Sequence, residues 1–426
     1  MKSLAIPFLL VFAFVFTACS GEEEEIHATL TIHAEDGETE ESLQAVRTVL
    51  FRGAEQAPVG RAVFPNQDGA IKFRMLEPGT YTLRMERQDY ARVPAAGTDF
   101  VPFTLEAGDD AELTVSMFAL DGPPTGYVSG TAKDPDGNAL AGVLVTGTGT
   151  AGSSTSISDE NGGFVLYNLP EGTYQVKGWL GGHETETKQT SIVPDHATDD
   201  VALVLTPGAT GAVYGNVKFH GTDAIEVDVA LLDPATGERI PGLLTETVKQ
   251  QYRLEGVPTG TLLARASYRN DGMVMDPDWI RKFGEPEVVI TGNEVQLEFT
   301  LREAARIVAP TNTADRIVPV EVAAADLEFS WEAYPSADHY VVEVVDAQGR
   351  VVWGGFDEER ERNHTVPKAE TSAVFNFDET ATAELKPGHV YHWRVFVTRN
   401  DQSTGEWYFL SVSEDRKGLF RIAAEE

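Results

Sequence analysis

Near the middle of the chain stands the segment Phe164-Val165-Leu166-Tyr167-Asn168-Leu169-Pro170-Glu171-Gly172-Thr173-Tyr174. Two related segments read Ile71-Lys72-Phe73-Arg74-Met75-Leu76-Glu77-Pro78-Gly79-Thr80-Tyr81 and Tyr252-Arg253-Leu254-Glu255-Gly256-Val257-Pro258-Thr259-Gly260-Thr261-Leu262. Aligned on Gly79, Gly172 and Gly260, which stand 93 and 88 residues apart, their apolar positions coincide. Each copy alternates apolar and polar residues as a half-buried strand does, and then places Pro and Gly before a second strand. We therefore predict a β-hairpin corner in each copy, inside tandem domains of about ninety residues.

The composition of the 426-residue chain suggests its domain number and excludes one class of partner. Hydrophobic residues make up 42%, enough for several packed cores, and the length suggests three or four domains. The net charge is −34, and the acidic residues are spread along the chain. Such a surface repels phosphate backbones, so we expect no nucleic-acid partner. We predict an all-β fold of tandem Ig-like or transthyretin-like β-sandwiches, with a single helical turn over residues 277–283.

The first residues have the features of a secretion signal. Lys2 precedes an uncharged apolar run, Leu4–Phe16, that is too short to span a hydrocarbon core of about 30 Å. We therefore assign residues 1–18 to a signal peptide. Phe16-Thr17-Ala18-Cys19 resembles the bacterial lipobox, which implies cleavage before Cys19 and a lipid anchor on it. Cys19 is the single cysteine, so no intrachain disulfide can form; the alternative is an ordinary secretory signal followed by an incidental cysteine.

An acidic run follows the cysteine. Residues 19–25 include Glu22–Glu25, which we interpret either as a solvated tether or as a sorting signal. The run resembles the acidic lipoprotein export signal of Bacteroidetes-type bacteria. That resemblance implies an outer-membrane, surface-exposed, lipid-anchored protein.

Residues 126–207 carry the strongest family resemblance. The motifs are Val128-Ser129-Gly130-Thr131-Ala132, Asp134-Pro135-Asp136-Gly137-Asn138-Ala139-Leu140-Ala141-Gly142-Val143-Leu144-Val145 and Asp159-Glu160-Asn161-Gly162-Gly163-Phe164, followed by the central repeat. This pattern resembles the carboxypeptidase regulatory-like domain, a transthyretin-like β-sandwich. The ranges 26–120 and 208–303 keep the central repeat but depart from the pattern at the front, so we expect divergent copies there. The resemblance implies an accessory fold and not a peptidase, because no catalytic zinc motif accompanies it.

The last segment, 304–426, is of another type. Its expected strands contain Leu327–Trp331, Tyr340–Val345, Val351–Trp353, Tyr391–Val397 and Trp407–Leu410. An early strand Trp and a later Tyr shortly after Leu385-Lys386-Pro387-Gly388 resemble a fibronectin type III domain. Short linkers at 121–126, 206–211 and 304–311 suggest a row of sandwiches, and the first two, which are rich in Pro or Gly, should allow modest bending.

Few residues suggest chemistry. The acidic turns at 134–138 and 159–162 contain calcium-type oxygen ligands, but Asp, Asn and Gly are also ordinary turn formers. No nucleophile elbow or phosphate-binding loop is present in the sequence. Trp179 and Trp279 are the candidates for stacking on a sugar ring; the alternative for both is that they cover the edge of a core. Trp331 and Trp393 are expected in the core.

We therefore expect a non-catalytic envelope lipoprotein without cofactor or metal, anchored through Cys19. Its predicted role is structural or interactive, as an adhesion or scaffold module that contacts an envelope protein or a glycan. One alternative is a carbohydrate-binding lipoprotein of a nutrient-uptake system. A second alternative is an enzyme with an unrecognised carboxylate site.

Overall fold

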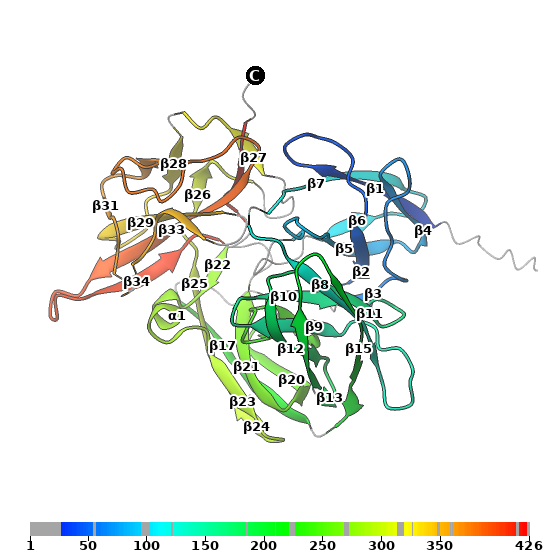
Figure 1. Ribbon diagram of the computed structural model, residues 1–426. Coiled ribbons are helices and arrows are strands. Elements are labelled where there is room, and N and C mark those ends of the chain that lie inside the picture. Colours follow the sequence, from blue (N-terminus) through cyan, green and yellow to red (C-terminus); the bar gives the residue numbers. More distant parts are fainter. Residues whose placement is uncertain are drawn as a thin grey trace, which may run out of the picture.

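The structure is a computed structural model that describes residues 27–423 apart from 54–56, 95–101, 121, 185, 209, 221–225, 268–271, 313–318, 326, 347–349, 358, 360 and 415–416. It is built almost entirely of β-strands, which form successive two-sheet sandwiches along the chain (Figure 1). The all-β prediction is confirmed. The helical turn is confirmed as well, as α1 (Pro277–Phe283), which Asp276 caps through its side chain.

The first sandwich sets a topology that the next two repeat. One sheet has the order β4-β1-β7, with β1 antiparallel to β4 and parallel to β7. The other sheet has the order β3-β2-β5-β6. The strands are β1 (Ala28–Asp36), β2 (Arg47–Arg52), β3 (Ala57–Pro58), β4 (Ala70–Leu76), β5 (Gly79–Glu86), β6 (Phe103–Leu105) and β7 (Asp110–Met117).

The second and third sandwiches place their own first strand in the same position. β8 lies between antiparallel β11 and parallel β15, and β17 pairs antiparallel with β20 and parallel with β25. The second comprises β8 (Gly126–Lys133), β9 (Leu144–Gly149), β10 (Gly152–Ile157), β11 (Gly163–Leu169), β12 (Gly172–Trp179), β13 (His183–Glu184), β14 (Thr187–Ile192), β15 (Ala197–Val204) and β16 (Thr206–Pro207). The third comprises β17 (Thr210–His220), β18 (Val227–Leu232), β19 (Arg239–Val248), β20 (Gln251–Pro258), β21 (Gly260–Ser267), β22 (Met273–Met275), β23 (Glu287–Ile290), β24 (Glu294–Gln296) and β25 (Phe299–Glu303).

The repeated segment is a strand, a turn and a strand, as predicted, but it is not a hairpin. Its two strands, β4 and β5 in the first copy, belong to opposite sheets, so the segment crosses from one sheet to the other. The crossing begins with a β-bulge at which Met75, Asn168 and Gly256 take φ values of +58°, +60° and +68°. An alternating pattern specifies a strand but not its partner, which explains why the sequence favoured the simpler hairpin.

The fourth sandwich has a different topology. A sheet of order β26-β28-β32 faces a larger one in which β33 pairs with β29, β34 and β35. Its predicted strands are all present, and Trp331 and Trp393 are in its core as expected. The strands are β26 (Ile307–Ala309), β27 (Val320–Val322), β28 (Glu328–Trp331), β29 (His339–Asp346), β30 (Val351–Gly354), β31 (Val366–Pro367), β32 (Ser372–Val374), β33 (Val390–Asn400), β34 (Trp407–Val412) and β35 (Leu419–Ile422).

The sandwiches pack against one another, so the expectation of a bendable row is wrong. Figure 1 shows the chain folding back, with the red and orange fourth sandwich beside the blue first one. There the His389 Nε2 atom lies 2.7 Å from Glu38 Oε1. Two of the predicted linkers contain strands, because β16 pairs with β13 and β26 pairs with β28. One apolar core draws side chains from each of the first three sandwiches, among them Phe51, Trp179 and Leu254.

Candidate binding site at the junction of three sandwiches

A cluster of buried charges holds the first three sandwiches together. Arg84, on β5, has a fully buried side chain and donates to Glu86 Oε1 at 2.5 Å and to Glu238 Oε2 at 3.0 Å. Arg47 Nη1 donates to Glu86 Oε2 at 2.8 Å, and Arg92 pairs with Glu238 Oε1. Arg47, Arg84, Glu86 and Arg92 come from the first sandwich, whereas Glu238 directly precedes β19 of the third. Each oxygen of both carboxylates thus accepts from an arginine.

The same arginines bind the second sandwich through its backbone and hydroxyl groups. Arg84 Nη2 donates to the carbonyl and the hydroxyl of Thr155, the latter at 2.7 Å. Arg47 Nη2 donates to the carbonyl oxygens of Ile157 at 3.1 Å and Gly163 at 2.9 Å. Charge-assisted bonds of this kind are stronger than neutral ones, and in a buried site salt screens them much less than at the surface. Arg47 on β2 and Arg84 on β5, which are neighbouring strands of the first sandwich, therefore fix the orientation of the second sandwich.

Two further side chains of the second sandwich bind the first. The Asn168 amide donates to the carbonyls of Arg87 and Tyr90, at 3.1 and 2.8 Å, and its oxygen accepts from Asp89 N at 2.6 Å. Asp159 Oδ2 accepts from Ala62 N at 2.9 Å. Asn168 occupies the bulge of the repeated segment, so the bulge itself supplies the contact. Asp159, which the sequence assigned to a turn, thus also joins two domains.

A glycine seam, comprising Gly181, Gly182, Gly242 and Gly256, joins the second sandwich to the third. Gly182 N donates to Gly256 O at 2.6 Å, and Gly181 N donates to Pro241 O at 3.3 Å. A Cβ added at Gly181 would lie 3.1 Å from Gly242 O, and one at Gly256 would lie 3.1 Å from Gly182 N. A side chain at Gly181 or Gly256 would therefore require the facing backbone to move by a few tenths of an ångström, and the φ of +68° at Gly256 also favours glycine.

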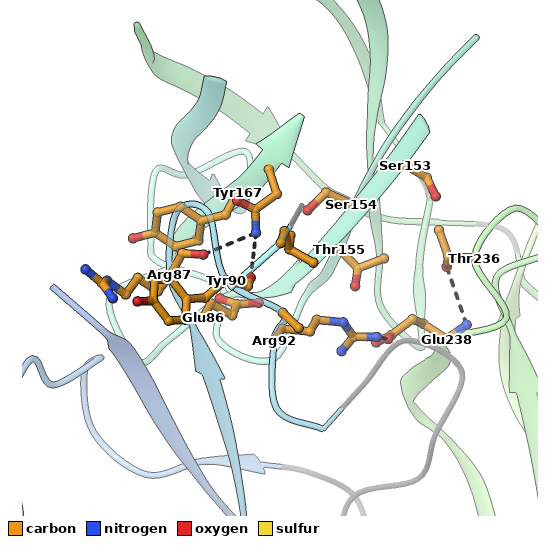
Figure 2. Close-up of a pocket in the computed structure, with 13 residues that line it drawn as sticks. Glu86, Arg87, Tyr90, Arg92, Ser153, Ser154, Thr155, Tyr167, Thr236 and Glu238 are labelled. Atoms are coloured by element: carbon orange, nitrogen blue, oxygen red, sulfur yellow. Dashed lines mark hydrogen bonds and ion pairs between the residues drawn. The ribbon is translucent and has the colours of Figure 1, made fainter. Parts of the chain in front are cut away.

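Between the three sandwiches lies a cavity of ≈ 240 Å³ (Figure 2). In this view Arg87 and Tyr90 lie at one end, whereas Ser153, Thr236 and Glu238 lie at the other. Ser153 is exposed, so that end is open to solvent. The lining residues are Glu86, Arg87, Tyr90, Ala91, Arg92, Leu120, Ser153, Ser154, Thr155, Tyr167, Asn168, Thr236 and Glu238.

Burial shifts two titrating groups at this cavity. Burial, with the neighbouring charge of Arg84, lowers the pKa of Arg92. Burial also raises the pKa of Tyr167 from its ordinary value of 10.0 to about 12, and the charge of Glu86 acts in the same direction. The site therefore disfavours further positive charge near Arg92 and favours a neutral phenol at Tyr167.

The structure separates the two tryptophans that were candidates for sugar stacking. Trp179, at the end of β12, is only 1% exposed and belongs to the shared core, so it offers no face to a sugar, and the expectation that it does is wrong. Lys177 Nζ lies 3.6 Å from the centroid of its ring. Trp279, on α1, is 48% exposed. Cys19 lies outside the described residues.

The acidic turns use their carboxylates locally. Asp134 accepts from the backbone and the side chain of Asn138, and Asp159 accepts from Asn161 N and Gly163 N. The turn-forming interpretation is therefore the one the geometry supports. Within the described part of the chain, no group of three or more His, Cys, Asp or Glu side chains is arranged to hold a metal ion. In that same part, no helix is long and apolar enough to cross a bilayer.

Sequence reasoning missed the junction. Arg84 and Glu86 alternate with the buried Leu83 and Met85, a pattern that by itself would place the two charged side chains on the solvent face of a half-buried strand. The sequence does contain one indication of the junction. Arg84 and Glu86 have opposite charges and stand two residues apart on the same face of β5, so they can form an ion pair without another domain. That signal is weak, because most such pairs are solvated.

Comparisons with known proteins agree with part of this description. No curated protein matches the chain significantly. Among solved structures, the Bacillus anthracis TIE protein is 14% identical, covering 65% of this chain and 51% of that one, with a TM-score of 0.19. The Streptococcal ancillary pilin (15% identity, covering 65% and 98%) and the Bacillus cereus major pilin subunit BcpA (10%, covering 65% and 100%) each have a TM-score of 0.20. Scores this low mean that the whole chains do not superpose, so nothing about this protein follows from these likenesses. Residues 127–206 match the family described as the Carboxypeptidase regulatory-like domain.

Proposed function

We propose that this chain is a non-catalytic envelope lipoprotein whose packed sandwiches form one rigid interaction module. The observation that carries the proposal is the ionic cluster at the junction. All four carboxylate oxygens of Glu86 and Glu238 accept from arginines, and the arginines in turn hold the neighbouring sandwiches. This arrangement suits a structural joint, whereas an acid–base catalyst needs a carboxyl oxygen that a substrate can reach.

A lipid on Cys19 would tether the module to the outer membrane, with the acidic run as a spacer or sorting signal. Intact-mass analysis of the mature protein tests this directly. We expect an acylated Cys19, loss of membrane association in Cys19→Ala, and unchanged anchoring in the matched variant Ser20→Ala. An unmodified mature N-terminus would remove the anchor from the proposal. Replacement of Glu22–Glu25 by alanine, followed by protease digestion of intact cells, tests surface exposure.

The partner is expected to be another envelope protein or a glycan. Cross-linking in intact cells, followed by recovery of the full-length protein, tests the interaction role. We expect one recurrent partner whose cross-links fall on a surface shared by neighbouring sandwiches. Cross-links confined to a single sandwich would contradict the idea that the packed block is the binding unit.

A second candidate function is carbohydrate binding, as in a nutrient-uptake lipoprotein, and it is favoured by the exposure of Trp279. An exposed indole can stack on the apolar face of a sugar ring. A panel of polysaccharides tests it, with Trp279→Ala as the probe and Phe64→Ala as the control, because Phe64 is similarly exposed at 51% but lies in the first sandwich. Retention in wild type and Phe64→Ala with loss in Trp279→Ala is the expected result; equal retention by all three excludes Trp279.

A further inference from the structure

One edge of the second sandwich is an uncovered β-strand. β14 is the last strand of the sheet β10-β9-β12-β14, and it pairs with β12 over six successive residues without a register shift. At the opposite edge of the same sheet, the first sandwich covers β10, because Arg84 donates to Thr155 O and Arg47 donates to Ile157 O. Within the described part of the chain, no strand other than β12 pairs with β14. The sheet therefore ends at β14 with backbone groups that a further strand could bind.

The register of β12 and β14 shows which backbone groups of β14 point outward. Gly178 N donates to Glu186 O at 3.1 Å, so these two residues form a hydrogen-bonded pair. Hydrogen-bonded and non-hydrogen-bonded pairs alternate along antiparallel strands, so the N–H and C=O groups of Thr187, Gln189 and Ser191 point away from β12. The carbonyl of Ser191 accepts from a hydroxyl on β15 at 3.2 Å. The outward groups of Thr187 and Gln189 bond to no described residue.

The other sheet edges of the first three sandwiches carry features that oppose pairing with another chain. Among the described edge strands, β4, β11, β15, β19 and β20 contain bulges or register shifts, and β7 exposes Asp110 and Glu112. The strands β3, β6, β13, β16, β22, β23 and β24 have at most four residues each. In contrast, β14 has six residues, without proline, bulge or acidic side chain. Its one charged residue, Lys188, forms an ion pair with Glu186, so the edge is close to neutral.

A second copy of β14 is complementary to this edge. In an antiparallel pair with Gln189 on the two-fold axis, Thr187 lies opposite Ser191 of the second copy, so outward groups meet outward groups. Lys188 lies opposite Thr190, and no like charges face each other. The exposed Gln189 amide both donates and accepts, so the two copies of this side chain can bond across the axis. In a chain of net charge −34, a segment without acidic residues is also where two copies repel each other least.

We propose that two copies of this protein associate through their β14 strands, which joins two four-stranded sheets into one continuous sheet of order β10-β9-β12-β14-β14-β12-β9-β10. The contact is a single strand pair between two acidic bodies, so the association is reversible. Salt strengthens it, because added ions screen the repulsion between the two bodies. The contact is independent of the lipid anchor and of the envelope partner proposed above.

Sedimentation velocity of the full mature chain over a series of protein concentrations tests the proposal. We expect the mass to rise from one chain to two, at a lower protein concentration in about 1 M than in about 0.1 M sodium chloride. Hydrogen exchange at the amides of Thr187 and Gln189 should slow as the dimer forms. A chain that remains monomeric at millimolar concentration in both salts overturns the proposal. A monomer whose β14 amides gain protection only from an envelope extract pairs with a foreign strand, which also overturns it.

Substitutions at the two-fold axis identify the contact. Gln189→Lys places like charges opposite each other, so we expect about tenfold weaker association. An equimolar mixture of Gln189→Lys and Gln189→Glu should restore the dimer as a mixed pair. Gln189→Pro removes an outward N–H, a change that edge strands tolerate, and should abolish the dimer. Gln296→Lys is the matched control, because Gln296 is exposed on β24 of the third sandwich.

The control should associate like wild type. Equal association of wild type, Gln189→Lys and Gln189→Pro overturns the proposal, because the dimer would then form through another surface. A mixture of Gln189→Lys and Gln189→Glu that associates no better than either variant alone also overturns it, because the two Gln189 side chains would then not face each other.

Discussion

Replacing Arg84 by methionine should uncouple the first three sandwiches. Methionine retains much of the buried volume but removes the donors to Glu86, Glu238 and Thr155. Breaking a buried ion pair by removing one partner costs about 3–5 kcal/mol. Because Arg47 still pairs with Glu86 and Arg92 with Glu238, we expect the lower end, about 3 kcal/mol. At roughly 2 °C per kcal/mol for a large domain, the unfolding midpoint falls by about 6 °C.

Scanning calorimetry with hydrogen exchange provides the measurement. We expect the midpoint of the first three sandwiches to fall and exchange to rise in β2, β10 and β19, while the fourth sandwich is unaffected. Arg253→Met is the matched control, because Arg253 forms two ion pairs, with Glu255 and Glu294, but is exposed to solvent. Exposed pairs contribute little, so this variant should unfold like wild type. If Arg84→Met unfolds no earlier than Arg253→Met, the ionic cluster does not hold the junction.

Three further predictions concern the repeated corner, the glycine seam and the cavity. Met75→Asn should stabilise the protein by about 0.5–1 kcal/mol, because Met75 is 72% exposed and has a φ of +58°, a region that asparagine tolerates. Asn168 has a similar φ at the same position of the next copy. A urea unfolding midpoint no higher than that of Met75→Ala would contradict this prediction. Gly256→Ala should lower the free energy of unfolding more than Gly237→Ala does. Both glycines have φ +68°, but only Gly256 has a neighbouring backbone within 4 Å of an added Cβ. Equal falls in the unfolding temperature of the two variants would mean that the backbones of the glycine seam move apart without cost. Burial raises the pKa of Tyr167 from its ordinary 10.0 to about 12, so its contribution to stability is complete below pH 10 and is lost as the pH rises through 12. Tyr167→Phe should therefore reduce the loss of stability between pH 10 and 12, as measured by unfolding at a series of pH values. An unchanged dependence of stability on pH would contradict the raised pKa of Tyr167.

The sequence carried the class of fold and the repeated unit, because both depend on local patterns. Alternation in the segment around Gly172, and its recurrence around Gly79 and Gly260, specify strands and turns wherever they occur. The partner of each strand is a nonlocal property, and this is why the corner was expected as a hairpin. The positive φ at Met75 was also hidden, since methionine gives no sign of a left-handed conformation.

The junction was the part that local patterns could not predict. Trp179 closes a strand whose inward side chains are Tyr174 and Val176, but it enters a different core, to which the first and third sandwiches also contribute side chains. Likewise, Arg84 has the position of a solvent-facing residue until a second and a third sandwich cover it. The helical turn that contains Trp279 was predicted correctly, because the features that start a helix, such as Pro277 at its first position, are local in the sequence.

The shared core around Trp179 also bears on how this protein was assembled by evolution. A module that closes its own interior can be copied into new genes, because nothing apolar is left uncovered at its borders. Here excision of residues 126–207 would expose the indole of Trp179 together with Leu144 and Ile157 to water. Genetic exchange that preserves solubility would therefore transfer the first three sandwiches as one inherited block, and recombination breakpoints should fall near residue 304 rather than within the trio.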